Sequence, residues 1–130
     1  MTPSQPSPLH EAVTRGDEAT LQALLANGAP PDVRDAQGFT PLHLAAQQGS
    51  VHAATALLDA GADVDAVNAH GNTPLFVAVF NSQGRGALIQ LLRARGADPF
   101  HANNSGQTPL GLAKLIGNYD VARFFSDLEA

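Results

Sequence analysis

Hydrophobic residues in this chain recur in short stripes that have helical spacing. In each stripe they occupy positions i, i+3 and i+4, which places them along one side of a helix that buries only that side. The stripes are formed by Leu21, Leu24 and Leu25, by Ala54, Leu57 and Leu58, by Leu88, Leu91 and Leu92, and by Val121, Phe124 and Phe125. The pattern therefore predicts four amphipathic helices at nearly regular intervals.

A short polar-to-apolar motif precedes each stripe and predicts a second set of helices. It reads Thr-Pro-Leu-His in its fullest form, and it starts at Ser7, Thr40, Thr73 and Thr108. A Ser or Thr hydroxyl at a helix N-cap accepts a hydrogen bond from a free backbone N–H, and Pro at the next position has no N–H to leave unpaired. Each unit of the pattern should thus contain two helices.

Glycines mark the predicted ends of the helices and the turns of the loops. Three follow the first helices as residues that adopt positive φ without strain: Gly16, Gly49 and Gly117. The second helices run into Gly-Ala pairs, and another glycine follows ten residues later, at Gly38, Gly71 and Gly106. The stretches between are rich in Asp, Asn, Pro and Val, which favours an extended, hairpin-like loop with a tight turn.

Taken together, these motifs resemble the ankyrin-repeat family, whose unit of about 33 residues combines a turn with two antiparallel helices and carries a T-P-L-H-x-A signature. The segment 35–63 matches that pattern almost throughout, and the resemblance extends from Ser7 to about Leu128. It implies an all-α ankyrin-repeat solenoid of antiparallel helix pairs joined by hairpin-like loops. We expect a disordered leader over residues 1–6 and one domain over 7–130, with repeats at about 7–34, 35–67, 68–102 and 103–130.

Both ends of the array carry polar residues where the middle units have apolar ones. Glu11 takes a place that is apolar in the other units, and the last unit ends with Ser126, Asp127 and Glu129. Terminal repeats need a polar outer face because no neighbour covers them. These residues are therefore predicted to be caps of a complete, self-contained array.

The third unit is two residues longer than its neighbours. One interpretation places one extra residue in the turn 81–86 and the other after Leu92, so that Leu88, Leu91 and Leu92 form the stripe. In the other, both extra residues lie in the Gly-rich turn, and Ile89 and Leu92 carry the stripe. The sequence leaves both open.

Charge and composition narrow the range of possible functions. A net charge of −5 argues against a nucleic-acid partner, because such proteins need a basic face to displace counterions from phosphate. The absence of Cys removes disulfides and thiolate zinc sites and fits a cytoplasmic location, and an Arg- and Ala-rich chain with a single Lys hints at a bacterial source. No apolar run is long enough for a membrane span, and the N-terminus has no secretory pattern. We expect a monomer in isolation.

No motif predicts catalysis, a metal site or a cofactor. His10 and His43 belong to the repeated motif and are expected to join hydrogen-bond networks between repeats. Phe76 and Gly111 replace them in the later units, so no histidine ladder exists for a metal. The Asp63-x-Asp65-x-x-Asn68 stretch lacks the Gly and the distal Glu of a calcium loop, and its side chains are expected to cap turns. No nucleophile motif occurs, so the chain is not expected to be an enzyme.

The resemblance implies that a protein partner docks on a concave face built from the hairpin tips and the exposed side of the first helices. Mapped onto this sequence, that face comprises Arg34, Gln37, Phe39, Gln47, Gln48, Val67, His70, Asn72, Phe80, Asn81, Asn104, Gln107, Leu115 and Ile116. A second candidate surface is the edge that holds Arg85, Arg93 and Arg95, which would suit an acidic partner. The predicted function is non-catalytic protein binding, and the alternative is a regulatory subunit or inhibitor that modulates an enzyme.

Overall fold

A computed structural model describes residues 7–116 and 120–128 of the chain. The predicted end glycine Gly117 and the predicted cap residue Glu129 lie outside these residues. The described part contains seven α-helices and one 3-10 helix, and no strand. They are α1 (Pro8–Arg15), α2 (Glu18–Ala26), α3 (Pro41–Gln48), α4 (Val51–Asp59), α5 (Pro74–Asn81), α6 (Ala87–Ala94), α7 (Pro109–Leu115) and the 3-10 helix η1 (Ala122–Leu128).

The first helix of every repeat begins as the sequence predicts. A Ser or Thr hydroxyl caps α1, α3, α5 and α7 by accepting a hydrogen bond from the backbone N–H three residues on, and Pro follows each cap. Gly16 and Gly49 end α1 and α3 with φ of 69° and 71°, the left-handed conformation that glycine adopts without strain. These local interactions explain why the helices are short and evenly spaced.

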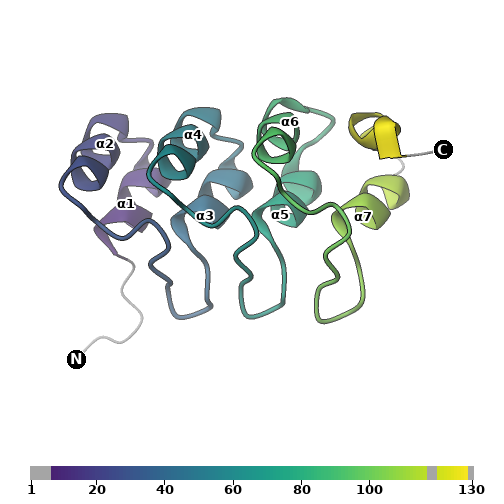
Figure 1. Ribbon diagram of the computed structural model, residues 1–130, viewed down its shortest axis with the longest axis horizontal. Helices are drawn as coiled ribbons and strands as arrows, with labels where there is room; N and C mark the ends of the chain where they lie inside the picture. Colours follow the sequence, from purple (N-terminus) through teal and green to yellow (C-terminus); the bar gives the residue numbers. More distant parts are fainter. Residues whose placement is uncertain (1–6, 117–119, 129–130) are drawn as a thin grey trace.

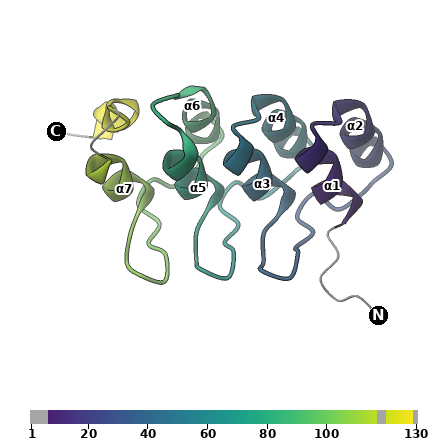
Figure 2. The ribbon, with the colours of Figure 1, turned by 180° about the vertical axis from the view of Figure 1, so that it is seen from behind.

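The helices form a single row of antiparallel pairs (Figures 1 and 2). The first helices α1, α3, α5 and α7 pack on one another in sequence order, and α2, α4 and α6 cover them as a second layer. The three loops that join one pair to the next project from the same side of the row. The all-α solenoid predicted from the sequence is confirmed.

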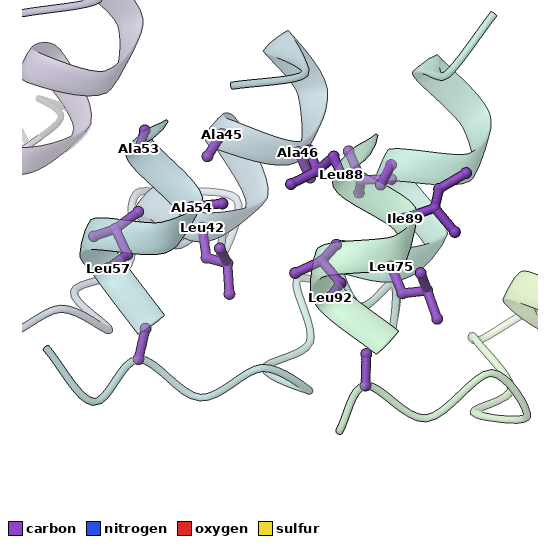
Figure 3. Packing of buried hydrophobic residues seen from close by; sticks show 14 of the residues in the cluster. Leu42, Ala45, Ala46, Ala53, Ala54, Leu57, Leu75, Leu88, Ile89 and Leu92 are labelled. Atoms are coloured by element: carbon purple, nitrogen blue, oxygen red, sulfur yellow. The ribbon is translucent and has the colours of Figure 1, made fainter. Parts of the chain in front are cut away.

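The hydrophobic core runs between the two helix layers along the row. Figure 3 shows its middle section, where Leu42 and Leu75 of the first helices meet residues of α4 and α6. Leu57 is fully buried there, and Ala54 beside it lets α4 approach α3 closely. Each repeat thus buries its apolar side chains partly against its neighbours, which is why such arrays gain stability from stacking.

The loops between repeats are joined laterally by hydrogen bonds. The N–H of Ala69 donates to the carbonyl of Gln37 at 3.0 Å, and the N–H of Asn104 donates to that of His70 at the same distance. Within each loop an Asp or Asn side chain accepts two backbone N–H groups, and the residues concerned are Asp35, Asn68 and Asn103. These bonds hold the three loops as a rigid row of hairpin-like projections.

The third repeat follows the second of its two interpretations, and the stripe of Leu88, Leu91 and Leu92 is wrong. Ile89 and Leu92 are fully buried, whereas Leu91 is half-buried. The N–H of Ala97 donates to Leu92 as that of Ala62 donates to Leu57, so Leu92 and Leu57 are equivalent (Figure 3). Both extra residues therefore lie in the loop between α5 and α6.

The last predicted helix differs from expectation. Its expected stripe begins at Val121, but the structure has a 3-10 helix that starts one residue later and contains non-helical angles at Phe125. Val121 and Phe125 are fully buried, and Phe124 is half-buried. This element packs against α7, and it is short, as is typical of 3-10 helices because their side chains at i and i+3 eclipse.

The Gly84-Arg85-Gly86 stretch helps to hold this 3-10 helix in place. The ring of Phe124 lies so close to Gly86 that a Cβ atom at this position would be 2.1 Å from it. Arg123 donates from Nη2 to the carbonyl of Gly84 at 3.4 Å. The second glycine is thus required for close packing at the end of the array.

The two ends are polar as predicted where the structure describes them. Glu11 is exposed at one end, and Ser126 and Asp127 are exposed at the other. Asp127 also forms a bidentate ion pair with Arg93, with distances of 2.8 and 2.9 Å. This pair ties the 3-10 helix to α6.

Candidate protein-binding groove

Hydrogen bonds from two buried histidines, His10 and His43, link neighbouring repeats. The Nε2–H of His43 donates to the carbonyl of Asn72 at 2.8 Å, and that of His10 donates to the carbonyl of Phe39 at the same distance. On the other side of the ring, Nδ1 of His43 lies 2.9 Å from the Thr40 hydroxyl. The predicted inter-repeat network is confirmed for both histidines.

The partners of His43 determine its protonation state. A carbonyl oxygen can only accept, so Nε2 must carry a proton, and Nδ1 accepts the backbone N–H of Thr40 at 3.1 Å. The side chain is therefore the neutral imidazole that is protonated on Nε2. Burial lowers its pKa below the ordinary value of 6.5, although the carbonyl of Asn72 works in the opposite direction.

Acid should weaken the fold through this histidine. Because the pKa of His43 is lowered in the folded state, its contribution to stability is complete above about pH 6.5 and is lost progressively as the pH falls toward the folded-state value. We expect the free energy of unfolding to decrease between pH 7.5 and pH 5.5 in urea titrations. The His43→Phe variant should show a smaller decrease over that interval, and an equal decrease would contradict this role.

The third repeat breaks the histidine pattern, and this changes the surface. Phe76 occupies the position that His43 has in the second repeat, and its side chain cannot donate a hydrogen bond to the next loop. It is 7% exposed and contributes an aromatic wall to a cavity between the second and third repeats. In the first two repeats a His hydrogen-bonds to the next loop, whereas in the third repeat an apolar ring lines a surface cavity.

This cavity has a volume of about 250 Å³ and lies between two loops and the helices α3 and α5. We call it the anchor cavity. Its lining residues are Phe39, Gln47, Asn68, His70, Asn72, Phe76, Val77, Phe80 and Asn81. Apolar rings and side-chain amides dominate this lining, and none of these residues is Lys, Arg, Asp or Glu. Concave apolar sites with a few polar groups are typical binding sites.

Two aromatic side chains at the anchor cavity, Phe39 and Phe80, differ in how deeply they are buried. Phe80 is 69% exposed on α5, at the rim of the anchor cavity. Phe39 is half-buried and packs edge-on against His43, with 5.6 Å between ring centroids. Phe39 therefore contributes to the fold as well as to the cavity, whereas Phe80 is available to a partner.

The structure brings together only part of the residue set proposed from the resemblance. Those at the anchor cavity are Phe39, Gln47, His70, Asn72, Phe80 and Asn81. Those outside the cavity lining are Arg34, Gln37, Gln48, Val67, Asn104, Gln107, Leu115 and Ile116.

Several residues outside the cavity are engaged in contacts between repeats. Arg34 donates to the carbonyls of Gly38 and Val67. Gln48 donates to the carbonyl of Thr14 at 3.3 Å, and the side chain of Asn104 donates to that of Ala69 at 3.0 Å. These side chains hold the array together in addition to facing solvent.

At the C-terminal end, two predicted residues have different surroundings. Leu115 is 71% exposed, while Ile116 packs in part against the core. Neither lines the anchor cavity. They are thus separate from the anchor cavity.

Three residues that line the cavity are absent from the predicted set, namely Asn68, Phe76 and Val77. Asn68 and Val77 gave no distinguishing signal, since each has a plain structural role in its repeat. The replacement of His by Phe76 was visible in the sequence. Its consequence for the surface could have been inferred from the lost polar partner.

The edge formed by Arg85, Arg93 and Arg95 is not a free basic patch. Arg93 pairs with Asp127, and Arg95 pairs with Asp59 at 2.8 Å. Among the described residues Arg85 has no ion pair, and its Nε donates to the carbonyl of Ser82 at 3.2 Å. Two of the three arginines at this predicted edge are therefore already paired with carboxylates.

Within 7–116 and 120–128, no group of three or more His, Asp or Glu side chains could hold a metal ion. In that same part of the chain no helix has the length and apolar character that a membrane span requires. The Asp63 and Asp65 carboxylates instead accept backbone N–H groups, at 3.0 and 2.9 Å.

Comparison with known proteins agrees with the architecture. A family model for ankyrin repeats, in three copies, matches residues 9–101. A search of curated proteins returns no significant match. Ankyrin repeats generally serve as protein–protein interaction modules and are typically non-catalytic. On the matched repeats and the stacked helix pairs, the chain belongs to the ankyrin-repeat family.

Proposed function

We propose that this chain is a non-catalytic module that binds a protein partner through the groove between its second and third repeats. The observation that carries the proposal is the anchor cavity, with the exposed ring of Phe80 at its rim. A large, exposed aromatic ring beside a concave apolar site is the usual form of a binding hot spot. The family's general role in protein binding supports the same conclusion.

The lining of the anchor cavity also favours a protein as the partner over a nucleic acid or a charged metabolite. It supplies the side-chain amide of Gln47 and the remaining hydrogen-bonding capacity of Asn72 and Asn81, which already bond to Asn103 and to the carbonyl of Val77. These groups can pair with the N–H and C=O groups of a peptide backbone. Nucleic-acid binding needs phosphate contacts from Lys and Arg, and the anchor cavity has neither. An open cavity lined by side-chain amides and apolar rings suits an extended polypeptide.

Capture of the partner tests the groove directly. Phe80→Ala should reduce recovery of the partner from a native-host extract by about tenfold or more, because hot-spot aromatics contribute at least about 2 kcal/mol to binding. The same substitution should change the free energy of unfolding by less than about 0.5 kcal/mol, since surface positions contribute little to stability. Recovery would be measured by quantitative mass spectrometry, and stability by urea titration.

Phe100 provides a matched control for this experiment. Its ring is 58% exposed, and it does not line the anchor cavity. Phe100→Ala removes the same chemical group from another part of the surface and should leave recovery unchanged. Equal recovery by wild type and Phe80→Ala, or a loss confined to Phe100→Ala, would place the binding site elsewhere.

A further inference from the structure

A second, smaller cavity adjoins the anchor cavity near the C-terminal end of α5. This second cavity has a volume of about 110 Å³ and is lined in part by Gly49, Ser82, Arg85 and Leu88. The two cavities share Asn81. The residues that line the two adjoining cavities therefore extend along α5 from the hairpin before it to the loop after it, and we call the two cavities together the groove.

The loop at this end is longer than its counterparts in the first and second repeats, where two residues separate the helices. It spans residues 82–86, whereas only Gly49 and Ser50 separate the helices of the second repeat. Gln83 and Gly84 adopt positive φ of 52° and 86° within it. A non-glycine residue in this conformation is uncommon, so the longer loop is held in a specific shape.

Among the described residues that line either cavity, Arg85 is the only Lys, Arg, Asp or Glu. It is exposed, and its side chain donates from Nε to the carbonyl of Ser82, which also accepts the backbone N–H of Arg85. No carboxylate of the described residues pairs with it. The anchor cavity thus forms an uncharged, apolar end of the groove, and the second cavity forms an end with one cation, Arg85.

The apolar end is large enough for one bulky side chain. Cavities of about 150 Å³ accept a benzene molecule, and the anchor cavity measures about 250 Å³. An eight-residue helix such as α5 is about 12 Å long, which an extended peptide covers in about three or four residues. One short segment can therefore reach both ends of the groove.

We infer that the groove binds an extended, acidic segment of a partner protein, whose large aliphatic or aromatic side chain enters the anchor cavity while a carboxylate pairs with Arg85. The carboxylate lies about two to four residues from the anchoring side chain, given the length of α5. The inference rests on the proposed protein-binding function and adds the chemistry of the ligand. Although the chain carries a net charge of −5, charges beyond about 10 Å are screened at ordinary salt, so the local cation decides the preference.

Selection from a phage-displayed library of random peptides tests this inference. Wild-type protein should enrich peptides that carry a bulky apolar residue and an Asp or Glu at a constant separation. A synthetic peptide of the enriched sequence, and a copy in which Lys replaces the acidic residue, would then be titrated by fluorescence anisotropy. Arg85→Glu should weaken the acidic peptide by about tenfold and bind the Lys peptide more tightly than wild type does.

Three further variants complete the design. Arg85→Gln should lose the preference for the acidic peptide without reversing it. Arg15→Glu makes the same change of charge on an exposed side chain that lines neither cavity, and it should alter affinity less than about twofold. Phe80→Ala should weaken both peptides by about tenfold or more. Thermal unfolding of each variant shows whether it is folded.

The outcomes separate this inference from the proposed function. Reversal of the charge preference in Arg85→Glu alone supports the inference. Selected peptides that need Phe80 but bind Arg85→Glu as well as wild type would overturn the acidic-ligand inference and leave the groove as the binding site. Failure to enrich any peptide would overturn the inference, and peptides that bind without needing Phe80 would overturn both.

Discussion

Replacing Leu57 with alanine is expected to lower the free energy of unfolding by about 2–5 kcal/mol, because the change opens a cavity in a fully packed core. Leu57 has no exposed surface and lies between α4 and the first helices. Its position in a middle repeat adds to the effect, since each interface stabilises its neighbour. Urea unfolding followed by circular dichroism measures the difference.

Three further leucines provide the control and a test of register. Leu58→Ala, at a half-buried position of α4, should cost clearly less than Leu57→Ala. In the third repeat, Leu92→Ala should resemble Leu57→Ala, and Leu91→Ala should resemble Leu58→Ala. An unchanged unfolding midpoint in Leu57→Ala, or a larger loss in Leu91→Ala than in Leu92→Ala, would show that the stripes are assigned wrongly.

The second large effect is expected for His43→Phe, which should cost about 1–3 kcal/mol because it leaves the buried N–H of Thr40 without an acceptor and removes one of the two hydrogen bonds to the carbonyl of Asn72. The Thr40 N–H would lose its acceptor on Nδ1, and the carbonyl of Asn72 would lose its bond from Nε2. Phe76 already occupies this place in the third repeat, so the ring itself fits the fold. The cost should therefore come from lost hydrogen bonds rather than from a clash.

His52→Phe is the matched control for that substitution. His52 is exposed on α4, and the same exchange there should change the free energy of unfolding by less than about 0.5 kcal/mol. The loss in His43→Phe should be measured at pH 7.5, where the imidazole is neutral. A His43→Phe variant as stable as wild type would mean that the network between repeats contributes nothing.

The sequence predicts local features of this fold well. Helix starts at Ser7 and Thr40 and helix ends at Gly16 and Gly49 depend on hydrogen bonds and φ angles within a few residues, so the local sequence determines them. The regular spacing then specifies the stacking. His43 could be assigned a structural role because its motif repeats.

Features that depend on tertiary packing were harder to predict. Either placement of the extra residues in the third repeat keeps an apolar stripe on α6, and only packing against α5 selects Ile89 and Leu92. The pairing of Arg93 with Asp127 joins residues far apart in the chain. The anchor cavity likewise depends on how Phe76 and Phe80 lie relative to two loops.

Site-specific photo-crosslinking is the most direct test of the central claim that the groove between the second and third repeats binds a protein. A benzophenone amino acid would replace Phe80 in one variant and Phe100 in another, since both rings are exposed and only Phe80 borders the anchor cavity. Irradiation in a native-host extract should give a crosslinked protein for position 80 and little or none for position 100. Equal crosslinking at both positions, or crosslinking at position 100 alone, would contradict the account.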